Sequence, residues 1–349
     1  MMEFREGNAV FKVPEFEKVT SKSKVFYNPD MEYDRHLSLA VFRASGKKEV
    51  CDAFSGSGIR AILYALEGGK VTANDVNPHA VELIRKNAEL NGVSLRILNE
   101  DANILFRKEK FEVIDLDPFG SPARYLDSVM CGLKNDSLLF VTATDTEALC
   151  GYAKKAALRK YGVKTVRTPF AKELGVRVLV TAILREGAKY GFGFSVLLSY
   201  WRRHYIRVVM RARWSKKAAL ESMKMVNPVY FCRCGYFSAD LKEKCPFCKE
   251  NVQQISSVYL GRIKEKEFLE RVEFNSLIER LKNEFDTPFY YNTHHLAEFH
   301  GFQPPKINEL IEKLKETSSA SRTIFCSTGV KTDAPIHELL EIIHSMQKT

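Results

Sequence analysis

Residues 115 to 122, DLDPFGSP, place two carboxylates, a proline and an aromatic ring within a few positions of one another. The apolar residues that precede and separate the acids are typical of a strand buried in a parallel sheet. Because Pro118 cannot donate a ladder hydrogen bond and disfavours helix at the residue before it, we expect Asp117 to lie extended at the carboxyl end of that strand. Ligands bind at this edge of open α/β sheets, so Asp117 is a candidate for chemistry. The alternative is a strand-terminating Asp-Pro turn.

The elements that would position Asp117 begin at residue 49. Strand and helix signals alternate from there in the segments EVCDAFSGSG, IRAILYALEGG, KVTANDVN, PHAVELIRKNAELNG and SLRILNEDA. This order predicts a βαβαβ unit with a parallel sheet and crossover helices. Asn77 as N-cap, Pro78 as first helical residue and Gly92 after the end bound the second helix.

A glycine-rich turn, FSGSGIR, follows the first predicted strand. Gly56 and Gly58 leave room for the backbone to approach a ligand closely. The second strand ends in Asp75, which is placed to accept hydrogen bonds from ribose hydroxyls, and the third ends in Asp101. Together these residues predict a nucleoside pocket. A dinucleotide fingerprint would place a third glycine at position 61, where this chain has the occasionally tolerated alanine.

The spacing of Asp52, Phe54, Gly56 and Gly58 resembles the D-x-F-x-G-x-G pattern of S-adenosylmethionine methyltransferases. This resemblance implies S-adenosylmethionine rather than a dinucleotide as the cofactor. In methyltransferases that modify amino groups conjugated to a ring, the fourth strand ends in Asp or Asn, then Pro and an aromatic residue. DPFG is similar to that pattern.

Chemistry explains these residue types. An exocyclic amine is a poor nucleophile because its lone pair is delocalised into the ring. The Asp117 carboxylate and the backbone carbonyl before or at Pro118 can each accept an N–H, which localises electron density on nitrogen and orients it. Phe119 would stack on a base that has left its own stack. Asp115 shares a strand face with Asp117 but lies deeper, so we predict a structural hydrogen-bonding role for it.

Segments along nearly the whole chain resemble one family, the tRNA (guanine-N2) dimethyltransferases acting at position 26 of tRNA. They are VFYNPDMEYDRH at 25 to 36, DAFSGSGIRA at 52 to 61, NDVNP at 74 to 78, EDAN at 100 to 103, DLDPFGSP at 115 to 122 and ASRTIF at 320 to 325. The resemblance implies donor contacts from Arg35, Arg60, Asp75, Asp101 and the backbone of Ala102. It assigns base binding and catalysis to Asp117, Pro118, Phe119 and Phe26, the two phenylalanines sandwiching guanine.

Two positions would be interpreted differently without the resemblance. Phe26 alone would be a core residue, and Arg60 alone a solvated helix residue or salt-bridge partner. The chain also departs from the family after Arg35, where the family often has an acid and this sequence has His36. The hydrogen bonding around Arg35 is therefore left open.

Composition sets the broader limits. The 349 residues suffice for two domains, and 45% hydrophobic residues support a buried core. A formal charge of +10 favours a polyanionic partner such as RNA, with a moderately basic soluble enzyme as the alternative. The amino terminus lacks a signal-peptide pattern, and no apolar stretch approaches the roughly 18 residues that span a bilayer. We expect a soluble, cytoplasmic protein without membrane contact.

Residues 192 to 214 contain two strand-like runs joined near Arg202 to His204, which predicts a hairpin closing the sheet. Basic side chains along it, together with the segment 154 to 164, predict a basic surface interleaved with tyrosine and tryptophan. The hairpin contributes Arg202, Arg203, Arg207, Arg211 and Arg213. Phosphate contact and a merely solvated strand face are both open interpretations of this surface.

Four clustered cysteines, Cys232, Cys234, Cys245 and Cys248, suit a tetrahedral zinc ion. All four ligand positions would be taken by protein, so the zinc would be structural. Free thiols are the alternative, since disulfides are rare in the cytoplasm. The remaining cysteines show no such spacing, and we expect buried thiols at Cys51, Cys131, Cys150 and Cys326.

The last segment, about 285 to 345, predicts a short helix, a longer helix opened by Pro304 and Pro305, and a strand-turn-strand. This order resembles a winged helix, a nucleic-acid-docking motif, although a packing domain without RNA contact remains an alternative. The three histidines of the first helix lack acids or cysteines at ligand spacing, so we do not predict metal ligands at His294, His295 and His300.

The sequence thus predicts an α/β protein with a Rossmann-like class I methyltransferase domain at 1–222. A smaller α+β, tRNA-binding domain at 223–349 would contain the zinc module, about 229–251, and the winged-helix-like segment. The predicted reaction transfers one or two methyl groups from S-adenosylmethionine to N2 of guanine 26 of tRNA. The alternatives are an amino methyltransferase of another RNA base or a protein amide, and a catalytically silent RNA-binding protein. No obligate protein partner is inferred.

Overall fold

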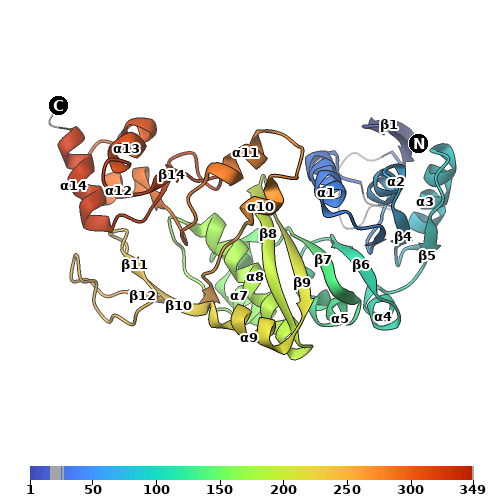
Figure 1. The fold of residues 1–349 in the computed structure, drawn as a ribbon, viewed down its shortest axis with the longest axis horizontal. Helices are drawn as coiled ribbons and strands as arrows, with labels where there is room; N and C mark the ends of the chain where they lie inside the picture. The colour runs from blue at the N-terminus through green and yellow to red at the C-terminus, as the bar shows by residue number, and fades with distance from the viewer. Residues whose placement is uncertain (16–24, 26, 348–349) are drawn as a thin grey trace.

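The computed structural model describes residues 1–15, 25 and 27–347, and its centre is a mixed sheet of seven strands in the order β5-β4-β3-β6-β7-β9-β8 (Figure 1). The first five strands in this order run parallel, and β9 is antiparallel to both of its neighbours. Their bounds are β3 Glu49–Asp52, β4 Lys70–Asn74, β5 Arg96–Leu98, β6 Phe111–Leu116, β7 Leu133–Ala143, β8 Phe192–Arg202 and β9 Tyr205–Trp214. The predicted βαβαβ unit and the predicted hairpin at 192 to 214 are confirmed.

Helices cover the sheet on both faces and form two hydrophobic cores with it. One core contains α1 Glu32–Ser45, α2 Ile59–Leu66 and α3 Pro78–Leu90, and the other contains α4 Ala102–Lys108, α5 Leu126–Cys131 and α8 Ala171–Lys189. Further helices follow β7 or flank the hairpin: α6 Thr146–Leu149, α7 Lys154–Tyr161 and α9 Lys216–Lys224. Single-turn 3-10 helices cover Pro29–Met31 and Pro122–Tyr125. The sheet is therefore buried on both faces, as its apolar parallel strands require.

Local sequence explains where the helices next to the parallel strands begin. Asn77 caps α3 by accepting a hydrogen bond from the His79 amide, and Pro78 is the first helical residue, as predicted. Asp101 caps α4 in the same way through the Asn103 amide. Gly58 precedes α2 with φ +84°, and a Cβ there would meet Ile84 at 3.2 Å. Glycine is thus needed at this turn for both conformation and space.

An amino-terminal hairpin, β1 Met2–Glu6 and β2 Ala9–Val13, packs on α3 and was not predicted. The amides of Val10 and Lys12 donate to the side chains of Asn91 and Asn87, each at 2.8 Å. This packing fixes the hairpin on the α/β core and brings Glu6 to α1.

The second half of the chain forms two further small sheets (Figure 1). The first comprises β10 Val226–Phe231, β11 Phe237–Ser238 and β12 Gln253–Tyr259, and is followed by α10 Lys266–Leu269 and α11 Ser276–Asn283. The last segment contains β13 Tyr291–Asn292, α12 Thr293–His300, α13 Ile307–Leu314, β14 Ala320–Arg322, β15 Gly329–Thr332 and α14 Ile336–Met346. The predicted order of two helices, strand, turn and strand is confirmed. The expectation of a longer second helix is wrong, because α12 and α13 both have eight residues; α13 begins only at Ile307, after the prolines and its N-cap Lys306.

The two halves share one aromatic core. Phe170, just before α8, packs on Phe231, Phe237 and Phe289 at centroid distances of 5.4, 5.6 and 4.3 Å. Arg177 of α8 also donates to the backbone oxygen of Tyr259 at 2.9 Å. The division at residue 222 stays a prediction, and the packing across it is continuous. In the described part of the chain, no helix combines the length and the apolar character needed to cross a bilayer.

Candidate active site

A cavity of about 300 Å³ lies at the carboxyl ends of β3, β6 and β7, the edge where the sequence places its candidate chemistry. Predicted site residues in its lining are Arg35, Asp52, Phe54, Gly56, Arg60, Asp117, Pro118 and Phe119. Thr144 and His204 also line it and were not predicted. Gly58, Asp75, Asp101 and Ala102 are not in this lining. Phe26 lies outside the described residues, so its predicted role is untested, while Tyr27 beside it lines the cavity.

Arg60 is the central side chain of the site. Its Nη2 atom donates to Asp34 at 2.8 Å and to Asp117 at 2.5 Å, and its Nη1 atom donates to Asp115 at 3.3 Å. Arg60 is buried rather than solvated, because three carboxylates on α1, β6 and the loop after β6 surround it. Asp117 and Arg60 are thus placed together by direct contact.

Behind this contact lies a fully buried layer built on Asp115 and Arg207. Asp115 accepts hydrogen bonds from Arg207 at 2.8 and 2.9 Å and from Tyr64 at 2.8 Å, as its predicted structural role requires. The prediction that Arg207 belongs to an exposed basic surface is wrong, since it is 1% exposed and also lies 3.5 Å from Asp34. Helix α1 covers that face of β9, which strand periodicity alone does not reveal. Arg203 and Arg213 are exposed, as predicted.

Burial and the neighbouring charges in this layer shift the pKa values of Asp34 and Asp117. Burial acts to raise the pKa of Asp34, but Arg207 and Arg60 outweigh it and hold the pKa below its ordinary value. Burial raises the pKa of Asp117, and Asp34 adds to the rise while Arg60 opposes it. Asp117 is 20% exposed and faces the cavity, so it is the acid of the group that a ligand can reach. A carboxylate with a raised pKa is a better proton acceptor than an ordinary one.

Asp52 at the end of β3 is a second acid in the cavity. It is 1% exposed, and its Oδ2 atom has no hydrogen-bond partner among the described residues. Burial, and then the charge of Asp115, raise the pKa of Asp52 to about 7. A buried carboxylate oxygen without a partner is costly unless a ligand supplies one. A cationic ligand such as S-adenosylmethionine fits this position by charge.

The structure shows which acid pairs with Arg35, the point left open by His36 in the sequence. Glu6 of the amino-terminal hairpin, 2% exposed, accepts from Arg35 Nε at 2.7 Å and from Tyr27 at 2.9 Å. A second hydrogen bond joins Arg35 Nη2 and the same carboxylate. The acid beside Arg35 therefore comes from 29 residues earlier in the chain, and His36 instead lies 3.9 Å from Glu32.

Asp75 and Asp101 hold the backbone at the neighbouring strand ends. Asp75 accepts from the amides of Gly56 and Asn77, each at 2.9 Å, and burial raises its pKa. Asp101 accepts from the amide of Asn103 at 2.7 Å. The ring of Tyr125 lies 4.7 Å from the ring of Phe54. Burial raises the pKa of the Tyr125 hydroxyl, and the charges of Asp101 and Asp75 add to the rise. The predicted ribose contact of Asp75 stays a prediction, and its carboxylate retains lone pairs for it.

Hydrogen bonds hold the DPFG loop at Gly120 and Ser121, while the side chain of Phe119 is exposed. Thr144, just after β7, accepts from the Gly120 amide at 3.1 Å, and its own amide donates to the Gly120 oxygen at 2.9 Å. Ser121 lies 2.8 Å from the hydroxyl of Tyr161. Phe119 is 63% exposed although its neighbours are anchored, which places an aromatic face at the mouth of the cavity.

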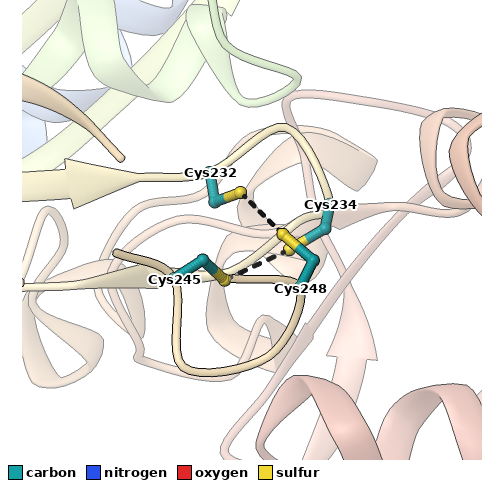
Figure 2. A group of neighbouring side chains, drawn as sticks. All are labelled: Cys232, Cys234, Cys245 and Cys248. Carbon is teal, nitrogen blue, oxygen red and sulfur yellow. Dashed lines mark hydrogen bonds between the residues drawn. The ribbon is translucent and has the colours of Figure 1, made fainter. Parts of the chain in front are cut away.

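Figure 2 shows the four predicted metal ligands converging from two loops of the module between β10 and β12. Their sulfur atoms lie within 4.8 Å of one another, with separations of 3.3 Å for Cys232–Cys248 and 3.6 Å for Cys234–Cys245. These separations exceed a disulfide bond, and a tetrahedral ion with zinc–sulfur bonds sets sulfurs about 3.8 Å apart. The cluster therefore fits a four-thiolate metal site.

The cysteine module is tied to α12 through backbone oxygens. Nε2 of His295 lies 2.7 Å from the Arg233 oxygen, and Nε2 of His300 lies 2.8 Å from the Cys234 oxygen. These histidines are thus structural contacts of the module, in line with the prediction that they are not ligands. Among the other cysteines, Cys51 and Cys150 are buried as predicted.

The same prediction is wrong for Cys131 and Cys326, which are half-buried. Cys131 ends the short helix α5 and lies 3.9 Å from Arg107 at the surface, and Cys326 lies in the turn between β14 and β15.

Comparison with known proteins agrees with this geometry. The solved structure of Trm1 from Pyrococcus horikoshii with S-adenosyl-L-methionine is 30% identical to this chain with a TM-score of 0.89, covering 98% of this chain and 99% of that one. The fold is that of a class I S-adenosylmethionine-dependent methyltransferase. The family model for N2,N2-dimethylguanosine tRNA methyltransferase matches residues 7–344. This chain belongs to that family.

Two relatives match over almost their whole length. The tRNA (guanine(26)-N(2))-dimethyltransferase of Methanothermobacter thermautotrophicus is 37% identical, over 98% of both chains. The enzyme of the same name from Archaeoglobus fulgidus is also 37% identical, over 99% of both. The resemblance carried by the sequence motifs is therefore confirmed at the level of the family.

Proposed function

We propose that this protein transfers methyl groups from S-adenosylmethionine to N2 of guanine 26 in tRNA, forming N2,N2-dimethylguanosine. Membership of the family and the likeness to relatives that carry this activity support the reaction. The observation that carries the site assignment is Asp117 in the cavity, with Arg60 at 2.5 Å on one side and the exposed ring of Phe119 two residues away.

When bound, S-adenosylmethionine supplies an electrophilic methyl group. The residues of the chain prepare the nucleophile: Asp117 accepts an N–H of guanine N2, and the carbonyl fixed by Pro118 accepts the other. Phe119 provides a face on which the guanine stacks. Orientation supplies most of the acceleration, because N2 must point its lone pair at the donor.

Each transfer releases one proton from N2. Asp117 takes that proton, for which its raised pKa suits it, and Arg60 stabilises the carboxylate when it is ionised. After the first transfer one N–H remains on N2, so a single acceptor still orients the nitrogen. The same residues therefore serve both methylations.

Donor binding falls to residues on the β3 and α1 sides of the cavity. Asp52 offers a buried carboxylate oxygen to a cation, and the backbone around Gly56 leaves room beside it. Arg35 offers the guanidinium N–H groups that neither Glu6 nor the Asn28 oxygen accepts, and Asp75 offers its carboxylate to the ribose. Asp101 and the Ala102 backbone extend this surface toward the base of the donor. Zinc in the four-cysteine cluster completes the proposal, with a structural role.

Product analysis tests the reaction. An unmodified tRNA transcript incubated with enzyme and donor should yield N2-methylguanosine and N2,N2-dimethylguanosine by mass spectrometry of the digest. A transcript with adenine at position 26 should yield neither. Appearance of the product from the adenine-26 transcript, or absence of both nucleosides from the normal one, contradicts the proposal.

Asp117→Ala tests the catalytic assignment. The rate should fall by about a factor of 100 to 10,000 while the donor dissociation constant stays near wild type. Asp127→Ala is a matched control, because that carboxylate is 51% exposed on α5 and pairs with Arg107 instead. Retained transfer in Asp117→Ala would remove Asp117 from the mechanism.

A further inference from the structure

A second hollow, of about 930 Å³, separates the segment after β7 from the cysteine module. Tyr152, Lys154 and Arg167 line it from the segment after β7, and Arg233 and His294 line it from the cysteine module and α12; these two sets of residues are called its walls below. Neither wall belongs to the cavity described above. The hollow is thus a groove between the two halves of the chain.

The groove is cationic. Lys154, Arg167 and Arg233 are all exposed, and none has a carboxylate within ion-pair distance among the described residues. Glu298 is the acid in its lining. Lys160, on the same helix as Lys154, is by contrast paired with Asp145 at 2.8 Å. Three cations left for solvent around one hollow attract a polyanion.

An aromatic face accompanies these charges. Tyr152 is 55% exposed, and the guanidinium of Arg167 lies 5.0 Å from its ring centroid. A ring flanked by a guanidinium suits a nucleotide, which offers a phosphate to the cation and a flat base or sugar to the ring.

Hydrogen bonds to the backbone hold both walls in place. Arg233 lies between Cys232 and Cys234, and its backbone oxygen contacts His295 at 2.7 Å. The facing loop is bonded to β12, with the Lys164 amide donating to Ser256 at 2.9 Å. The cations are therefore presented from fixed backbone, which lowers the entropy cost of binding.

Helix α7 connects the groove to the active site. Tyr161 at the end of this helix contacts Ser121 of the DPFG loop at 2.8 Å and Asp145 at 2.7 Å. Lys154 begins the same helix, which has eight residues and so is about 12 Å long. The groove thus starts about one short helix away from the loop that carries Asp117.

We propose that this groove holds the tRNA backbone next to the target guanine, with phosphates on Lys154, Arg167 and Arg233 and a nucleotide face on Tyr152. The assignment rests on the proposed function, since that function makes the polyanion a tRNA. Phosphate contacts of this kind set register and orientation, while base identity is read elsewhere.

The test is a double variant that removes one charge from each wall, Lys154→Ala with Arg233→Ala. Its dissociation constant for unmodified tRNA should rise about tenfold or more near physiological salt, with a shallower salt dependence, while donor affinity stays unchanged. The matched control is Lys70→Ala with Arg85→Ala, which removes the same two charge types from exposed positions outside the groove and should bind tRNA like wild type.

A second variant, Lys154→Glu with Arg167→Glu, leaves the cysteine module intact and should weaken tRNA binding further. Wild-type tRNA affinity in both groove variants would overturn the inference, as would an equal loss in the control. Because binding is measured without turnover, these outcomes are distinct from a failure of the methylation assay. If the groove instead holds an acidic protein segment, both variants will keep full tRNA affinity.

Discussion

Arg60 donates to Asp117 and to Asp34 from one guanidinium nitrogen, at 2.5 and 2.8 Å. Arg60, for which the family resemblance implies a donor contact, is therefore also the direct neighbour of Asp117, which is proposed to bind the base. Asp34 is fully buried and also lies 3.5 Å from Arg207, so it joins Arg60 to the buried layer. Asp34 is thus a positioning residue, which touches neither ligand in the proposal but sets where Arg60 and Asp117 lie.

Asp34→Asn should lower the rate of transfer by about 10- to 100-fold, because Arg60 loses one of the three carboxylates that position it. The charge of Asp34 raises the pKa of Asp117, so its removal should lower that pKa. Activity that requires ionised Asp117 should then persist to lower pH, and the acidic limb of the pH–rate profile should move down. Full pH–rate profiles at saturating donor measure this shift.

Tyr200→Phe is the matched control for Asp34→Asn, since it removes a 2.6 Å hydrogen bond to Asp34 but no charge. Its acidic limb should stay in place. A rate loss in Asp34→Asn with an unmoved limb would indicate general damage to the buried layer rather than the proposed coupling.

Asp52 should make donor binding depend on pH. Its folded-state pKa of about 7 exceeds the ordinary 3.8, so the free protein becomes less stable through this group as pH rises from about 4, and the loss is complete above 7. A cationic donor favours the ionised carboxylate and relieves that loss. The affinity for S-adenosylmethionine should therefore increase as pH rises through 7, as titration calorimetry between pH 5.5 and 8.5 can measure.

Asp52→Asn should bind the donor more weakly and with little pH dependence over this range. S-adenosylhomocysteine, which lacks the sulfonium charge, reports whether the sulfonium or the ammonium faces Asp52. An unchanged pH dependence in Asp52→Asn would assign the titration to another group.

Phe119→Ala should lower kcat/KM for tRNA by about 5- to 150-fold, which corresponds to the 1 to 3 kcal/mol of one base stack. The ring is 63% exposed in the free protein, so thermal stability and donor affinity should hardly change. Phe119→Tyr keeps the ring and should keep most of the activity. If alanine and tyrosine behave alike, the ring does not carry base binding.

Metal analysis tests the cysteine cluster. Wild-type protein purified without added metal should contain about one zinc ion per chain, and Cys234→Ser should lose most of it and melt at a lower temperature. Cys131→Ser, a half-buried thiol outside the cluster, should keep the ion. Purified protein with full stability and no bound metal would leave four ordinary thiols.

Local patterns predicted much of this molecule correctly. Depth along the strand distinguished Asp115 from Asp117, which share a strand face, and the cap residues around Asn77 set the start of α3. The four cysteines could be grouped from spacing because they lie within 17 positions on two loops. In each case the contacts that determine the structure join residues that are close in the sequence.

Long-range contacts account for what sequence could not predict. Glu6 reaches Arg35 only because an amino-terminal hairpin docks on α3, and no pattern around Glu6 announces this. Arg207 looked like one of several surface arginines, since a strand does not reveal which of its faces a distant helix covers. Asp34 lies in the segment 25 to 36 that resembles the family, yet its role follows only from three-dimensional contact with Arg60.

The ring of Phe170 packed among Phe231, Phe237 and Phe289 bears on how the protein can be divided experimentally. A cut near residue 222 would expose Phe170 to water on the first fragment. It would expose the three partner rings on the second fragment, because Phe170 no longer packs against them. Fragments and chimaeras joined there should aggregate, whereas grafts confined to the exposed loop at 239–244 spare these rings. Because the two halves share this core, they should be purified, crystallised and engineered together.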